Sequence, residues 1–141
     1  MVEAYFFVAA PADVVELRSL ASVPDDDLVD LVRLPGAEAL EALCAILGGS
    51  DARKGLREMP GGPRGAATVY ELGRPLEAAL LTAADDELRR GGARWATLPP
   101  WSALAANVYD LSETVVTLTE NYRAAADPAK RLFAWIEPSP R

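Results

Sequence analysis

The apolar residues between positions 108 and 125 recur at spacings of three and four residues, which is the repeat of a helix with one buried face. This apolar face consists of Val108, Leu111, Val115, Leu118, Tyr122 and Ala125. The opposite face is polar and carries Ser112, Glu113, Thr117, Glu120 and Asn121. Asp127-Pro128 follows, and because proline cannot continue a helix, the helix is predicted to end before it.

Two apolar segments, one near each end of the chain, predict strands in the interior of a sheet. Residues 132–136 contain no polar side chain, and residues 4–9 are apolar and aromatic and are followed by Pro11. Strands that are apolar on both faces are typical of a sheet interior. We therefore expect the terminal strands to pair at the centre of a small sheet. Four or five helices should pack around it in one α+β domain spanning residues 1–141.

The remaining elements follow from proline, glycine and the apolar spacing. Helices are predicted to begin at Pro11, at Asp25, at Pro35, at Pro75 and at Asp85. The second carries Leu28, Leu31 and Val32, the third ends at Gly48-Gly49, and the last ends at Gly91-Gly92. Residues 68–72 predict a short strand, residues 50–66 a long loop, and residues 93–101 an extended segment around Pro99-Pro100.

The charge of the chain is concentrated in its first third. Residues 1–50 hold nine acidic and two basic residues, which equals the net charge of −7 of the whole chain. This acidity argues against nucleic acid as a partner, because phosphate binding needs a basic surface. No apolar run approaches the roughly 20 residues that span a bilayer, and the start of the chain has no signal-peptide pattern. A cytoplasmic location without membrane attachment is therefore the expectation.

The residue inventory also restricts the chemistry. The chain has no histidine and a single cysteine, Cys44, so the common general base and the usual zinc ligands are missing. No catalytic residue, metal site or cofactor is predicted. The acidic run Asp25-Asp26-Asp27 with Asp30 lacks the glycine and the terminal glutamate of a calcium-binding loop. We interpret it as the start of a helix, where aspartate caps free backbone N–H groups.

A ligand pocket is the alternative site, between residues 61 and 101. The glycine-rich loop around Arg64 could bind an anion, although it fits no phosphate-binding fingerprint, and Tyr70 follows it. Trp95 and Trp101 flank the two prolines close to several arginines and would form a recognition patch if exposed, or part of the core if buried. Glu71 with Glu77 or Asp110 could in principle form a carboxylate pair, but no spacing selects them.

The order of the segments resembles that of the YfbM-like family of small bacterial proteins. The matching segments are residues 8–13, with proline before an acidic helix start, residues 43–48, residues 70–83, residues 122–125 and the final apolar residues 132–136. Where the family carries Asp-Lys-Ala-Trp, this chain has Gly36-Ala37-Glu38-Ala39. The resemblance implies a shared fold and, because the family has no settled activity, no function.

Two function classes follow from these observations. The first is a non-catalytic interaction domain, neutralising or regulatory, whose acidic first third binds a basic protein. Its candidate interface residues are Asp25, Asp26, Asp27 and Asp30. The second is a small-molecule binder or unusual enzyme with a pocket lined by arginine, tyrosine and tryptophan. Its candidate residues are Arg64, Tyr70, Trp95 and Trp101.

Overall fold

The first and last strands of the chain pair antiparallel along their whole length. In the computed structural model, which describes residues 1–49, 55–61 and 64–139, β1 (Val2–Ala9) lies beside β5 (Arg131–Pro138). Val2 is opposite Pro138 and Ala9 is opposite Arg131. The predicted pairing of the two apolar termini is confirmed. Both strands are interior, so their apolar side chains are covered on each face.

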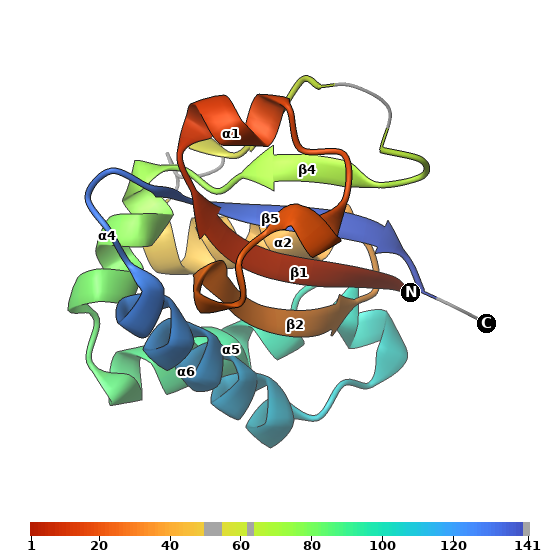
Figure 1. Cartoon of the computed structure of the whole chain (residues 1–141). Coiled ribbons are helices and arrows are strands. Elements are labelled where there is room, and N and C mark those ends of the chain that lie inside the picture. The colour runs from red at the N-terminus through yellow and green to blue at the C-terminus, as the bar shows by residue number, and fades with distance from the viewer. Residues whose placement is uncertain (50–54, 62–63, 140–141) are drawn as a thin grey trace.

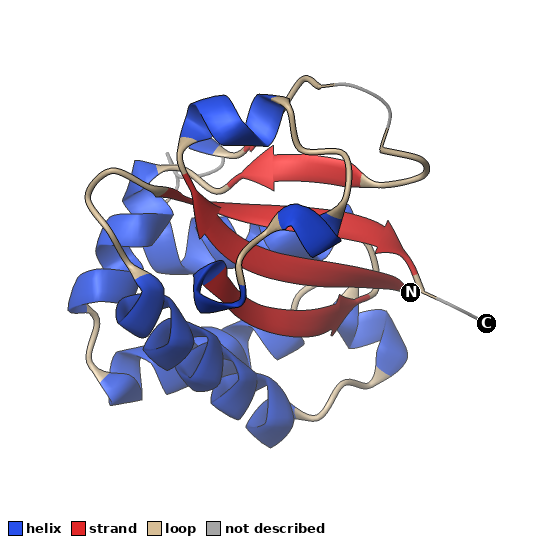
Figure 2. Cartoon of the chain, viewed as in Figure 1, coloured by secondary structure: helices blue, strands red, loops and turns tan. Residues whose placement is uncertain are grey.

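The sheet has five antiparallel strands in the order β2-β1-β5-β4-β3 (Figures 1 and 2). β2 (Leu28–Leu34) forms one edge, and the two-residue β3 (Arg57–Glu58) forms the other, next to β4 (Thr68–Glu71). The predicted strand near residue 70 is therefore confirmed. β3 lies inside the segment predicted to be a loop, of which residues 50–54 and 62–63 are outside the described part of the chain.

The helix predicted to begin at Asp25 is wrong. Asp25–Asp27 form a single 3-10 turn, η2, and β2 begins at the next residue. A bulge between Phe6 and Phe7 of the β1–β2 pairing shifts the alternation, so that the core-facing residues of β2 are Val29, Val32 and Leu34. Their spacing of three and two residues is not the strand repeat of two, which is why the segment resembles a helix in sequence.

Helices cover both faces of the sheet unequally (Figure 1). On one face the sheet shares a hydrophobic core with α2 (Ala37–Gly48), α4 (Arg74–Thr82), α5 (Asp85–Ala96) and α6 (Val108–Ala125), of which α2 and α6 contact β2. The other face is covered only in part, by α1 (Pro11–Val15) and the 3-10 turns η1 (Leu20–Ser22) and η2. The structure is an α+β fold, as predicted. None of the described helices is long and apolar enough to cross a membrane.

The predicted faces of α6 are largely confirmed. Leu111, Val115, Leu118 and Tyr122 are buried in the core, and the Asn107 side chain caps the first turn by accepting a hydrogen bond from the Asp110 N–H at 3.1 Å. Two residues differ from the expectation. Val108, at the exposed end of the helix, is 46% accessible, whereas Ser112 is buried and donates to the carbonyl oxygens of Val108 and Arg89.

Gly91 and Gly92 do not end a helix, because α5 continues through them to Ala96. They lie where α5 packs against α2 and α6. A Cβ on Gly92 would stand 2.6 Å from the Cα of Ser112 in α6, whereas one on Gly91 would meet side-chain atoms alone, the closest being the end of Leu47 at 2.7 Å. The missing side chains thus allow close helix packing. The extended segment expected over residues 93–101 is also wrong: its first four residues belong to α5, turns follow around the cis Pro99-Pro100 bond, and a 3-10 helix, η3 (Trp101–Leu104), begins at its last residue.

We expect Gly92→Ala to lower the free energy of unfolding by about 1–3 kcal/mol, because its methyl group meets the backbone of α6. Gly91→Ala is the matched control. Leu47 can move its side chain, and alanine favours a helix over glycine by roughly 1 kcal/mol, so this variant should lose little or no stability. Urea unfolding of both variants measures the difference. Equal losses would contradict the assigned contact.

Candidate functional site

Arg64, the first of the predicted pocket residues, is a structural clamp. Its guanidinium donates to the backbone carbonyl oxygens of Val14 and Leu17, both at 2.9 Å, and of Met59 and Pro60, both at 3.2 Å. Arg64 therefore fastens the end of α1 to the loop before β4. These bonds engage all three guanidinium nitrogens, so the side chain is occupied within the fold.

Trp95 and Trp101 are buried on the helix-covered side of the sheet. The Trp95 indole N–H donates to the carbonyl oxygen of Ala39 at 2.8 Å, and its ring meets that of Trp101 edge-on at 5.4 Å. Tyr70 packs against the same core from β4. Burial is the largest cause of the raised pKa of its hydroxyl, and the negative charge of Glu58 is the next. Arg64 binds α1 on the opposite side of the sheet, so the four predicted residues do not converge on one pocket.

The four aspartates of the predicted interface differ in exposure and in their contacts. Asp25 and Asp26 are exposed in η2, whose first turn has no side-chain cap, so the capping interpretation is wrong. Asp27 holds the Lys130 ammonium, with Oδ1 and Nζ 2.7 Å apart. Asp30 lies in β2 and accepts the N–H of Leu31 at 2.8 Å, although burial raises the pKa of its carboxyl group.

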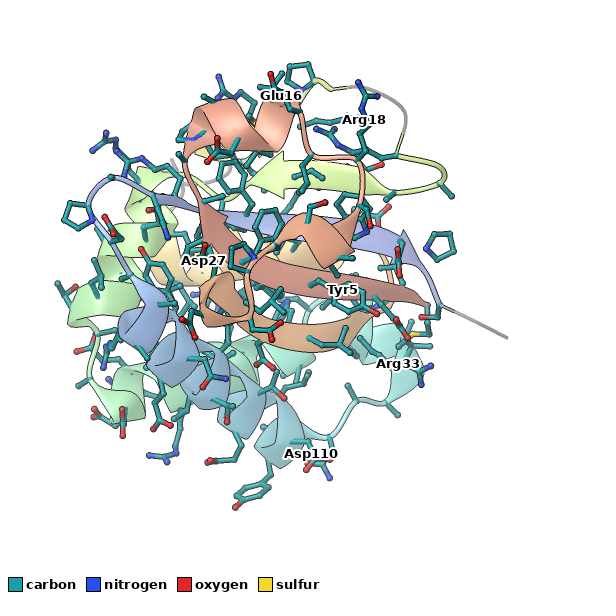
Figure 3. The ribbon with its side chains drawn as sticks, viewed as in Figure 1. Tyr5, Glu16, Arg18, Asp27, Arg33 and Asp110 are labelled. Carbon is teal, nitrogen blue, oxygen red and sulfur yellow. The ribbon has the colours of Figure 1, made fainter. Side chains whose placement is uncertain are left out.

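A cleft between α1 and η2 is the main feature of the incompletely covered face. Its volume is about 370 Å³. Its floor is apolar and is formed by Phe7, Val14, Leu17 and Val23. Three carboxylates line it, from Asp13, Glu16 and Asp27, together with the Lys130 ammonium. We call this the acidic cleft. Figure 3 shows Glu16 on the α1 side of the sheet and Asp27 near the start of β2.

A second cavity, of about 490 Å³, lies between α4, α6 and the turn that leads into β5. Its distinctive residue is Glu77, which is only 7% exposed and contributes to the cavity wall. The Tyr122 hydroxyl donates to Oε1 of Glu77 at 3.3 Å, while Oε2 has no hydrogen-bond partner among the described residues. Arg74, Lys130 and Arg131 complete a charged lining. We call this the Glu77 cavity.

The electrostatics of the Glu77 cavity reflect burial. Desolvation raises the pKa of the Glu77 carboxyl group, and Arg131 and the Tyr122 hydroxyl act in the opposite direction. Desolvation, with the neighbouring Glu77 charge, raises the pKa of Tyr122 to about 12. Buried acidic groups with shifted pKa values inside a cavity are typical of functional sites, although ion pairs with a purely structural role also have shifted pKa values.

No family model, curated protein or solved structure matches this chain. The likeness to the YfbM-like family therefore stays a prediction. The acidic cleft and the Glu77 cavity are therefore assigned from the structure of this chain alone.

The sequence contained a weak signal for the Glu77 cavity. Glu77 directly follows Leu76 and precedes Leu80 by three residues, so it falls on the buried side of α4. A carboxylate at such a position needs a partner or a ligand. Tyr122 was interpreted as a core residue of α6, and nothing in the spacing joins it to a residue 45 positions earlier.

Proposed function

We propose that this protein is a non-catalytic interaction domain that binds a basic protein segment at the acidic cleft. The observation that carries the proposal is one cavity with an apolar floor and three carboxylates at its margin, built from residues 7–27 and Lys130. Its acidic groups come from the part of the sequence that holds the net charge of the chain. A pocket with an apolar base and a charged rim is suited to an anchor side chain.

The chemistry of the cleft selects a lysine or arginine side chain. The aliphatic stem of either residue can pack against Val14 and Leu17 while its charged end meets the carboxylates. Asp27 already binds Lys130, so the carboxylates that remain for a partner are Asp13 and Glu16. Neither forms an ion pair or a hydrogen bond with another side chain in the described part of the chain, and both are exposed.

Clustered charge of this kind affects the rate of encounter more than the final affinity. The neighbouring Asp25 and Asp26 add to the same field without lining the cleft. A basic partner would therefore be attracted over a distance of about 8–10 Å at physiological salt. This distinguishes a binding role from general solubility, which any acidic surface would provide.

The test begins with capture of a partner from the native host and measures its association rate. Asp13→Asn, Glu16→Gln and Asp26→Asn together should slow association about tenfold at low salt and reduce its salt dependence. Asp27 and Asp30 are left unchanged because they hold Lys130 and the Leu31 N–H.

The matched control removes three carboxylates from the helix-covered side, with Asp85→Asn, Glu87→Gln and Asp110→Asn. All three residues are exposed, and Figure 3 shows Asp110 at the start of α6, far from Glu16. This variant has the same net charge as the cleft variant and should associate at nearly the parental rate. An acidic partner, or equal rates for the two variants, would overturn the proposal.

A further inference from the structure

The Glu77 cavity contains a buried acceptor that the fold leaves unused. Glu77 lies on the core side of α4, yet one of its carboxylate oxygens has no hydrogen bond to the described residues. A buried polar atom without a partner is unfavourable, and native structures normally satisfy such atoms by protein, water or ligand. Because the carboxylate turns readily about its last torsion, either oxygen can serve a group that enters the cavity.

The cavity also gathers positive charge in an acidic protein. Arg74, Lys130 and Arg131 line it against only two carboxylates, those of Glu77 and Asp127. The Lys130 ammonium is bound by Asp27, but Arg74 is exposed and forms no hydrogen bond or ion pair with the described residues. Within the described part of the chain, the Arg131 side chain makes one hydrogen bond, from Nη1 to the Lys130 carbonyl oxygen at 3.1 Å, and its other donors have no hydrogen-bond partner there.

Arginine pairs are suited to a planar anion, because the guanidinium donates two parallel hydrogen bonds to a carboxylate. Arg74 begins α4 and Arg131 begins β5, so two separate elements present these groups to one cavity. Leu81, Ala78 and the Tyr122 ring supply the apolar part of the wall. The volume of about 490 Å³ is within the range of small-ligand sites.

We propose that the Glu77 cavity binds a small carboxylic acid that also carries a hydroxyl or amino group. Arg74 and Arg131 bind the ligand carboxylate, and Glu77 accepts a hydrogen bond from the hydroxyl or amino donor. Tyr122 holds the other oxygen of Glu77 and so orients it. This inference uses different residues from the acidic cleft, apart from Lys130, and does not depend on a protein partner.

The alternative is a purely structural role, in which the hydrogen bond between Tyr122 and Glu77 only links α6 to α4. In that case Glu77→Gln and Tyr122→Phe would alter stability without changing the binding of any anion. The proposal instead makes Glu77 responsible for distinguishing ligands with a donor from ligands without one, because removing the donor leaves a buried acceptor unpaired.

The experiment is an NMR titration with propionate, lactate and alanine, which share a carboxylate. Lactate adds a hydroxyl and alanine an amino group to the propionate skeleton. At least one of these two should give saturable shifts around Tyr122 and bind about tenfold more tightly than propionate, as one charge-assisted hydrogen bond allows. Glu77→Gln should reduce that preference more than Tyr122→Phe, which removes only the hydroxyl that orients Glu77.

Arg74→Gln provides the second variant, because an exposed residue at the start of α4 can be changed without disturbing the core. It should weaken all carboxylate binding several-fold. Arg90→Gln, on the exposed side of α5 and paired there with Asp86, is the charge-matched control and should have no effect. The proposal is overturned if no probe saturates, if propionate binds as well as both donor-bearing acids, or if Arg74→Gln and Arg90→Gln bind alike.

Discussion

A chain that stops after Arg131 should show no cooperative unfolding transition. The truncation removes β5 beyond its first residue, and this strand pairs with β1 on one side and β4 on the other. It also removes five consecutive buried side chains from both cores, those of residues 132–136. Four of these side chains are large, and each costs about 1.5–3 kcal/mol when it loses its burial, so the loss is comparable to the usual total stability of a domain even before the lost sheet hydrogen bonds are considered.

Circular dichroism during urea titration measures this result. A chain that ends at Ser139 is the matched control, since it retains all of β5 and the hydrogen bond from the Ser139 N–H to the Met1 carbonyl oxygen. The control should unfold in a sigmoidal transition close to that of the full chain. A cooperative transition in the shorter chain would contradict the central role of β5.

Leu118→Ala should lower the free energy of unfolding by about 2–5 kcal/mol, as truncation of a buried leucine does elsewhere. Leu118 is 3% exposed and belongs to the main core between α6 and the sheet. The loss combines the transfer of the missing methyl groups with the cavity that remains. Its size depends on how far the neighbouring side chains can close the space.

Glu120→Ala, two residues further along α6, is the control. Glu120 is exposed and has no ion pair among the described residues, so its removal should change stability by less than about 0.5 kcal/mol. Urea midpoints compared at constant slope separate the two variants. Similar losses for Leu118→Ala and Glu120→Ala would mean that the buried face of α6 has been assigned incorrectly.

The sequence predicted the elements whose pattern is local. The helix spacing in α2, α4 and α6 and the apolar runs in β1 and β5 are visible without knowledge of the fold. β2 was missed because its bulge replaces the regular alternation, and the opening aspartates imitate a helix start. In sequence, Gly91-Gly92 predicts a helix end, because two glycines inside a helix are explained only by its close packing against α6.

The candidate sites depend on contacts that no local pattern records. Arg64 donates to the carbonyl oxygens of Val14 and Leu17, which precede it by 50 and 47 residues. In sequence, an arginine beside glycines suggests a loop that binds an anion. The folded structure shows instead that this arginine donates hydrogen bonds to the backbone of α1 and of the residues after it. Glu77 and Tyr122 likewise meet across 45 residues. The charge of the first third was visible, but not its arrangement around an apolar cleft.

The pairing of Val2 with Pro138 places the start of β1 next to the end of β5. A short peptide linker could therefore join them into a ring without disturbing the sheet. For a loop of more than 100 residues, the lost freedom of the unfolded ring is worth on the order of 5 kcal/mol. New ends could then be opened in the connection between α4 and α5. The order of the strands along the chain would change, while their order across the sheet would remain the same.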